Sequence, residues 1–270
     1  MTTVDSNPDP SLDDYTAAHE QLLAHFVALA RDLTDEQMAM RSLCPDWRVR
    51  DVISHIAIVE AVLDGWQATT DAPPPFNRVA ALHAELDALD RGAFAERVAE
   101  IADSRVDDLH GRDPSVLTMP SFTPTGPATY GRFLQIRVFD HWVHARDIAI
   151  PLGLEAPAPS GFAAENAVDE VAAALGYIVG KKIGLPDGMS IGFHLSGGVT
   201  RDLAVVVDGR AQVVASLAAP DVAITADAAS FVMLACGRVD PQGEIDAGRI
   251  SWNGDARWGE AAARNLRYTM

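Results

Sequence analysis

The periodicity of the sequence changes at residues 151–161, and this change limits the possible folds more than any other feature. Before it, apolar residues recur three and four positions apart, as they do on one face of a helix. After Gly184, short and partly alternating runs are divided by Gly, Asp and Pro, which is typical of strands. The segment 151–161 contains three prolines and fits no regular element. This order predicts an α+β protein, helical in its N-terminal part and mixed in its C-terminal part.

Four helices joined by loops are predicted in the N-terminal part, an arrangement typical of a helix bundle. We expect them at about residues 12–33, 47–69, 79–109 and 130–150. Pro45 and Asp46 are expected to end a loop and cap the second helix. Residues 111–128, rich in proline, are expected to form a long irregular loop.

The C-terminal part is predicted to be a small α+β domain. Asp208-Gly209 is a strong tight-turn signal between two of its strands. The expected strands are 189–195, 202–207, 211–215 and 222–225, with a short helix at 227–237 and a closing helix that ends at about 266. A chain of 270 residues also exceeds the usual size of one domain. We expect a helix bundle at 1–155, a linker and bridging helix at 156–184, and the C-terminal domain at 185–270.

Composition excludes several classes of partner. Lys and Arg number 21 against 38 Asp and Glu, which gives a net charge of −17. Such a charge repels phosphate backbones and anionic lipids, so we expect neither nucleic acid nor a membrane surface as partner. The first residues lack the basic start and apolar core of a signal peptide, and no apolar run is long enough to span a bilayer. Cys44 and Cys236 are the only cysteines, which is typical of a reducing cytoplasm.

Potential metal ligands are most closely spaced at residues 140–147, where two histidines and two carboxylates share one predicted helix. Asp140 and His144 are four residues apart and therefore on one face, so both can reach a single ion. Asp147 is placed to accept the other imidazole N–H of His144. The pair His141 and His144, at i, i+3 spacing, is also possible, and so is a set of polar residues satisfied within a core.

A third ligand is available at His55 in the second predicted helix, although a histidine beside an apolar stripe also fits as a packed core residue. Two imidazoles and a carboxylate are used by catalytic zinc and by non-haem iron, so the ligand set does not identify the metal. Other catalytic templates are missing: there is no G-x-S-x-G, phosphate-binding glycine loop or dinucleotide fingerprint. Cys44, which precedes Pro45 at a helix start, fits a structural thiol better than a nucleophile.

Two segments resemble the mycothiol-dependent maleylpyruvate isomerase family, which belongs to the DinB-like metal-binding helix bundles. They are CPDWRVRDVISH at 44–55 and the pattern in which Arg137, Asp140, His144 and Asp147 recur at spacings of three and four. The tail resembles the sterol-carrier-like C-terminal domain of the same enzymes, through Asp221–Asp227, Gly237-Arg238, Gly248–Ile250 and Gly254-Asp255. The resemblance covers both parts of the chain.

The resemblance implies a divalent metal, zinc in the family, held by His55, Asp140 and His144, and mycothiol as a thiol cosubstrate. It also implies that an arginine of the C-terminal domain serves the site, for which Arg238 and Arg249 are the candidates. One position departs from the family pattern, because the isomerase has Glu where this chain has Asp140. Asp is one methylene shorter, so an ion would lie closer to its helix or bind more weakly.

The expected function is therefore that of a mycothiol-dependent metalloenzyme acting on a small-molecule electrophile. The metal-activated thiolate would add to the electrophile, with either cis–trans isomerisation or S-conjugation as the outcome. Two alternatives from other classes are a non-catalytic small-molecule or lipid carrier and a regulatory metal-binding protein. We expect a cytoplasmic monomer or homodimer.

Overall fold

The computed structural model describes residues 9–268, which divide into two compact units. The first comprises the described residues up to Met40 together with Arg48–His141, and the second comprises Arg41–Trp47 and the residues from Trp142 onward. The fold is α+β, as predicted from the sequence. The domain bounds 1–155, 156–184 and 185–270 stay predictions.

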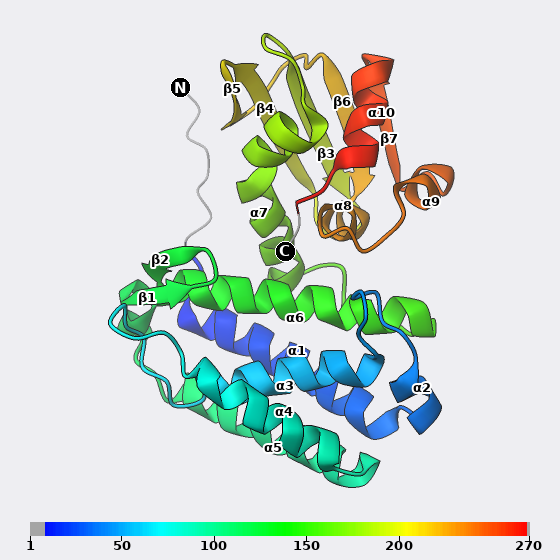
Figure 1. Ribbon diagram of the computed structural model, residues 1–270. Helices are drawn as coiled ribbons and strands as arrows, with labels where there is room; N and C mark the ends of the chain where they lie inside the picture. The colour runs from blue at the N-terminus through cyan, green and yellow to red at the C-terminus, as the bar shows by residue number, and fades with distance from the viewer. Residues whose placement is uncertain (1–8, 269–270) are drawn as a thin grey trace. The chain divides into compact units, whose positions relative to one another are not determined.

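The first unit is built from helices with one small hairpin (Figure 1). Its elements are α1 (Leu12–Asp32), α2 (Asp35–Ala39), α3 (Val49–Leu63), α4 (Val79–Ala88), α5 (Arg91–His110), strands β1 (Pro120–Thr123) and β2 (Gly126–Thr129), short 3-10 turns at Phe76–Arg78 and Pro114–Thr118, and helix α6 (Tyr130–Leu152), which continues into the second unit. Helix α5 packs against both α1 and α3. Phe26, Ile53 and Phe94 are among the fully buried side chains between these helices.

The predicted helix at 12–33 is confirmed, and a capping box fixes the position at which it begins. The Ser11 side chain accepts the N–H of Asp14, and the Asp14 carboxylate accepts the N–H of Ser11, which forms a capping box. The predicted start of the second helix is wrong in detail. Asp46 has a φ of 66° and lies outside the helix, whereas Arg48 takes the cap position and donates its N–H to Asp51.

The end predicted for that helix, near Thr69, is also wrong, because α3 ends at Leu63. Gly65 has a φ of 68°, a backbone conformation that glycine adopts readily and that ends a helix. The predicted helix at 79–109 is two helices, since Asp90 leaves the helical conformation and its carboxylate accepts the Ala93 N–H at 2.9 Å. Asp90 therefore caps α5 instead of lying on a charged helix face.

The loop expected at 111–128 contains regular structure. After the turn at Pro114–Thr118, β1 and β2 pair antiparallel, with Phe122 opposite Pro127 and Thr123 opposite Gly126. Strands of four residues that contain prolines are too short to show the alternation expected of a strand, so the sequence pattern did not reveal the hairpin.

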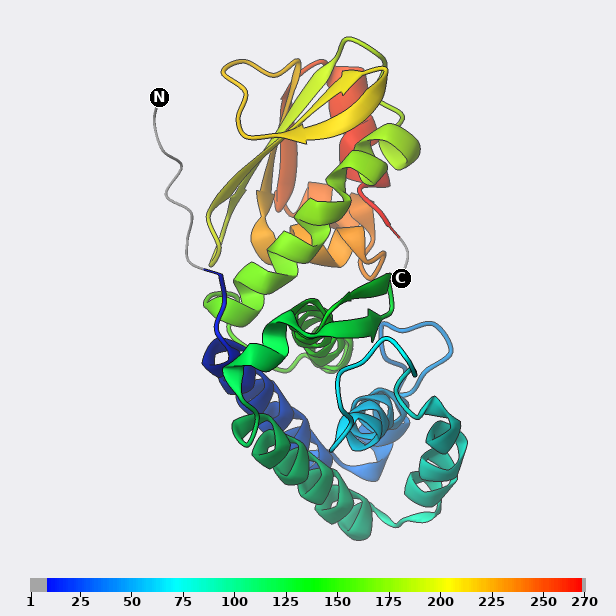
Figure 2. The ribbon, with the colours of Figure 1, turned by 90° about the vertical axis from the view of Figure 1, so that its left-hand side faces the viewer.

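The second unit is a five-stranded sheet with helices (Figure 2). Its elements are α7 (Phe162–Tyr177) with a π-helical end at Ile178–Ile183, β3 (Ser190–Ser196), β4 (Arg201–Asp208), β5 (Arg210–Val214), β6 (Val222–Asp227), α8 (Ala228–Ala235), α9 (Pro241–Asp246), β7 (Ile250–Gly254) and α10 (Ala256–Asn265). The strand order is β5-β4-β3-β6-β7, with β3 and β6 parallel and the other neighbours antiparallel. The four predicted strands and the turn at Asp208-Gly209 are confirmed, whereas α9 and β7 were not predicted.

One face of this sheet is covered by helices. Ile191, Phe193 and Leu195 alternate along β3 and are buried, and Phe193 meets Phe231 of α8 edge to face at 5.8 Å. Helix α7 packs on β4 and β5, and α10 packs on β6 and β7. Within residues 9–268 no helix has both the length and the apolar character to cross a membrane.

Candidate metal centre

His55 and Asp140 are brought together in the first unit, as the metal hypothesis requires. His55 lies on α3 and Asp140 on α6, and His55 Nε2 is 3.5 Å from Asp140 Oδ2. Their side chains are 31% and 14% exposed, so the pair is reachable from solvent. His144 follows Asp140 by one turn of the same continuous helix, so the helix itself sets their spacing.

Asp147 orients the imidazole of His144, which confirms the prediction made for it. Asp147 Oδ2 lies 2.9 Å from His144 Nδ1, and both residues are buried. Because a carboxylate only accepts, Nδ1 carries a proton, and in the neutral imidazole Nε2 is then the nitrogen with the lone pair. Trp47 stacks on the same imidazole at 6.0 Å between ring centroids. His144 is thus held on one nitrogen and on one ring face.

Cys44 lies in the second unit and contacts both His144 and Asp147 there. Its Sγ is 3.1 Å from Asp147 Oδ2 and 3.6 Å from His144 Nδ1, so the thiol donates to the carboxylate. Arg238 donates from Nε to Asp147 at 3.0 Å, and its Nη2 lies 3.4 Å from the sulfur. Burial alone would lower the pKa of Arg238, but the negative charge of Asp147 raises it above the usual value. Cys44 is a buried free thiol whose neighbours include a permanent cation.

The two candidate arginines have different surroundings. Arg238 is largely buried and contacts Asp147. Arg249 is 49% exposed and makes a two-pronged ion pair with Glu244, at 2.6 and 2.7 Å. Glu244 occupies both arms of the Arg249 guanidinium.

A buried charge network lies beside the His55–Asp140 pair in the first unit. Glu60 of α3 is fully buried, and its Oε1 accepts from Arg137 Nε at 2.9 Å and from Arg137 Nη2 at 2.7 Å. Its Oε2 accepts from Arg105 Nε at 3.0 Å. Burial alone would raise the pKa of Glu60, but the charge of Arg137, the hydrogen bond with His141 and the charge of Arg105 hold it well below the usual value. Glu60 is therefore ionised and paired on both oxygens.

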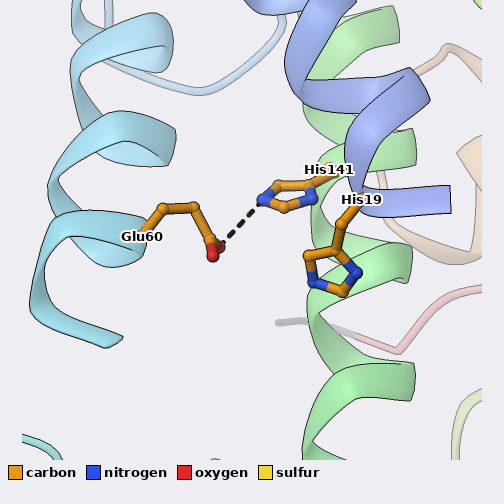
Figure 3. Close-up of side chains that lie close together, drawn as sticks. All are labelled: His19, Glu60 and His141. Carbon is orange, nitrogen blue, oxygen red and sulfur yellow. Dashed lines mark hydrogen bonds and ion pairs between the residues drawn. The ribbon is translucent and has the colours of Figure 1, made fainter. Parts of the chain in front are cut away.

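His19 and His141 lie against this carboxylate (Figure 3). His141 Nε2 is 3.0 Å from Glu60 Oε1, and the two imidazoles meet edge to face at 5.2 Å. These three side chains have ligand atoms within 4.8 Å of one another. However, Arg137 Nη2 lies 2.7 Å from Glu60 Oε1 and 3.2 Å from His141 Nε2, so a guanidinium already takes the place of a bound cation. We interpret this cluster as an internally neutralised network.

Both histidines are neutral. Burial lowers the pKa of His19 to about 3 and also lowers that of His141. His19 Nδ1 donates to the Tyr15 carbonyl at 2.8 Å. Within residues 9–268, His19 Nε2 and His141 Nδ1 have no hydrogen-bond partner. Such unpaired buried atoms make a positive charge on either ring costly.

Sequence reasoning missed Glu60, Arg105 and His19 as members of a network. Two signals were present: Glu60 is a lone acid in the apolar run Ile58–Leu63, and His19 falls four residues after Tyr15 on the buried face of α1. The sequence also gave His141 as one half of an alternative ligand pair with His144. The structure instead directs His141 Nε2 to Glu60.

Comparison with known proteins agrees with the resemblance in the sequence. The mycothiol maleylpyruvate isomerase N-terminal domain model matches residues 19–149, and the C-terminal domain model of the same family matches residues 165–261. A search of the curated proteins finds no match to this chain.

Two solved structures share the fold of this chain. Crystal structures of mycothiol-dependent maleylpyruvate isomerase and of a mutant of it each show 15% identity, a TM-score of 0.58, and coverage of 91% of this chain and 94% of theirs. Sterol carrier protein 2 like 2 from Aedes aegypti is 14% identical over 37% of this chain and 93% of its own, with a TM-score of 0.29, which is too low to establish a common fold. Because the two family models match most of the chain in the expected order, the chain belongs to the mycothiol maleylpyruvate isomerase family.

Proposed function

We propose that this protein is a mycothiol-dependent metalloenzyme that acts on a small electrophile, with His55, Asp140 and His144 as ligands of a divalent metal. One observation carries the proposal: His55 Nε2 is 3.5 Å from Asp140 Oδ2, one helical turn before His144 on α6. Zinc is the first candidate, because two imidazoles and a carboxylate leave it a fourth position for water or substrate.

The donor set fits such an ion. Asp147 accepts the Nδ1 proton of His144, and in a neutral imidazole held in this way Nε2 is the nitrogen that can bind a metal. His55 and Asp140 are partly exposed, so an ion and its exchangeable ligand have access to them. Asp140 contributes one negative charge, which it shares with Arg137, whose Nη1 donates to Asp140 Oδ2 at 2.7 Å.

A bound divalent metal would lower the pKa of a coordinated thiol and so supply a thiolate at neutral pH. We propose that the thiolate of mycothiol adds to an activated cis double bond of the substrate. The former double bond can then rotate, and loss of the same thiolate restores it in the trans form. If the anionic adduct instead takes up a proton from water at the neighbouring carbon, it persists as an S-conjugate.

We further propose Arg238, and not Arg249, as the arginine that serves this site. Arg238 contacts Asp147, which in turn holds His144, whereas both arms of Arg249 are taken by Glu244. Arg238 is then a positioning residue for His144 in the protein without substrate.

The metal is tested by elemental analysis and zinc titration of the protein purified without chelators. We expect one equivalent of metal in the wild type and its loss in His144→Ala. The matched control is His83→Ala, which removes a half-exposed histidine of α4 paired with Asp87 and should keep the metal. Wild-type protein without stoichiometric metal would contradict the proposal.

The reaction is tested by turnover of cis-configured activated alkenes, maleylpyruvate among them, with and without mycothiol. We expect turnover to require mycothiol and to fail in His144→Ala. Release of the trans isomer with thiol recovered indicates isomerisation, whereas stoichiometric consumption of the thiol indicates S-conjugation. Turnover that is equal without mycothiol would exclude both.

A carrier function has one observation in its favour. A hollow of about 310 Å³ lies on the face of the sheet away from the helices, over the small residues Gly192, Ala204 and Ala223. A carrier would bind an apolar fluorescent probe equally well in the wild type and in His144→Ala. Binding of this kind without any metal content would favour the carrier over the enzyme.

A further inference from the structure

Arg137 joins the proposed metal site to the buried network of the first unit. Its Nη1 donates to Asp140 Oδ2 at 2.7 Å, and its Nε and Nη2 donate to Glu60 Oε1 at 2.9 and 2.7 Å. One planar guanidinium therefore binds two carboxylates at once. Lysine lacks this rigid fork and cannot reproduce such a bridge.

The far end of the bridge is firmly anchored. Glu60 and Arg105 are fully buried, and they pair at 3.0 Å. Arg105 Nη2 also donates to the Tyr130 hydroxyl at 3.1 Å, and its Nη1 pairs with Asp108. The anchor thus draws on α3, α5 and α6, so Glu60 cannot shift without disturbing three packed helices.

This anchoring limits the orientation of the Asp140 side chain. Arg137 is buried, with only 7% of its side chain exposed, and it binds the same Oδ2 atom that faces His55 Nε2. A partly exposed aspartate would otherwise sample several rotamers and lose more entropy when it binds an ion. The held oxygen keeps Asp140 turned toward His55.

We propose that Arg137, anchored by Glu60, is a positioning residue that sets the orientation of Asp140 for metal binding. This inference rests on the proposed function, because it assigns a role relative to the ligands named there. It assigns no chemical step to Arg137.

The test uses Arg137→Lys in the full-length protein. The substitution keeps the positive charge, so a change in affinity reports lost geometry and not lost charge. Removal of a group that orients a metal ligand commonly lowers affinity by about 10–100-fold, and we expect a loss of zinc affinity in this range in a competition titration with a chromophoric chelator. The visible spectrum of the cobalt-loaded protein should also change, because it reports ligand geometry.

The matched control is Arg105→Lys, which disturbs the same buried carboxylate through Oε2 without touching Asp140. It should lower thermal stability but reduce zinc affinity clearly less than Arg137→Lys does, because Arg137 still bridges Glu60 and Asp140. Equal losses of affinity in both variants would mean a structural role and would overturn the proposal, as would wild-type affinity and spectrum in Arg137→Lys.

Glu60→Gln provides a second variant of nearly unchanged shape, which decides the question if circular dichroism shows that Arg137→Lys is unfolded. It weakens the anchor and leaves Arg137 and Asp140 in place, and we expect it also to lower zinc affinity. A folded Glu60→Gln protein with wild-type affinity and cobalt spectrum would overturn the proposal. Failure of the wild type to bind metal would instead refute the proposed function, so the two failures are distinguishable.

Discussion

His19 shows how the fold changes the chemistry of a single residue. The side chain is fully buried on α1, and burial lowers its pKa from 6.5 to about 3. Between these two values the unfolded chain binds a proton that the folded chain does not. Stability must therefore fall as the pH falls from about 6.5 toward 3. His141 acts in the same direction, because its pKa is also lowered by burial.

We expect His19→Gln to reduce this acid sensitivity, because glutamine does not titrate. At pH 4.5 the wild type should have lost about 2–3 kcal/mol through His19, at about 1.4 kcal/mol per pH unit below 6.5. Urea unfolding from pH 7 to pH 4.5 measures the slope for each protein. His83→Gln, at a half-exposed site, is the control and should keep the wild-type slope. A His19→Gln slope equal to that of the wild type would contradict the prediction.

At the scale of elements, short polar signals decide where helices begin and end. The α4–α5 break is one example: the apolar pattern continues across it, but the Asp90 carboxylate accepts the Ala93 N–H and starts a new helix. Gly65, which follows α3, adopts a positive φ and so ends that helix. Such signals act locally and compete with periodicity, so the pattern alone misplaced both boundaries.

Asp90→Ala should destabilise the protein by about 1 kcal/mol, within the range of about 0.5–2 kcal/mol found for lost N-caps. The loss arises because the Ala93 N–H in the first turn of α5 loses its partner. Chemical denaturation at pH 7 measures it. Asp103→Ala is the control, since Asp103 is exposed in the middle of the same helix and its loss should be close to neutral. Equal effects at both positions would exclude a capping role.

At the scale of the whole molecule, the net charge of −17 sets the long-range electrostatics. Local pairs such as Glu60 with Arg105 and Arg137 neutralise buried charge, but the excess of carboxylates over basic groups remains. Self-repulsion of this excess favours the expanded unfolded chain, and dissolved salt screens it over a Debye length of about 10 Å at 0.1 M.

We therefore expect the Tm of metal-free protein to rise when NaCl is increased from about 10 mM to about 150 mM, over which the Debye length shortens from about 30 to about 8 Å. Differential scanning calorimetry at fixed pH measures the shift. KCl at equal ionic strength should give the same rise, because screening depends on ionic strength and not on the cation. A Tm that is unchanged or falls would mean that self-repulsion does not limit stability.

Local periodicity and spacing were sufficient to predict the α+β class, the helices at 12–33 and 130–150, the main strands and the Asp147–His144 hydrogen bond. These features depend on residues close together in the chain, where helix and strand geometry is known in advance. The hairpin at 120–129 was missed because its strands are too short to show a period.

Only the tertiary structure determined which distant side chains meet. Arg238 reaches Asp147 across 91 residues, and Arg137 reaches Glu60 across 77. Periodicity identifies the buried face of each helix, but it does not say which faces pack together or which charges pair between them. The packing of α3, α5 and α6 around Glu60 decides which faces meet and which charges pair. An ionised carboxylate is stable at a buried position only when its partners converge on it from several elements.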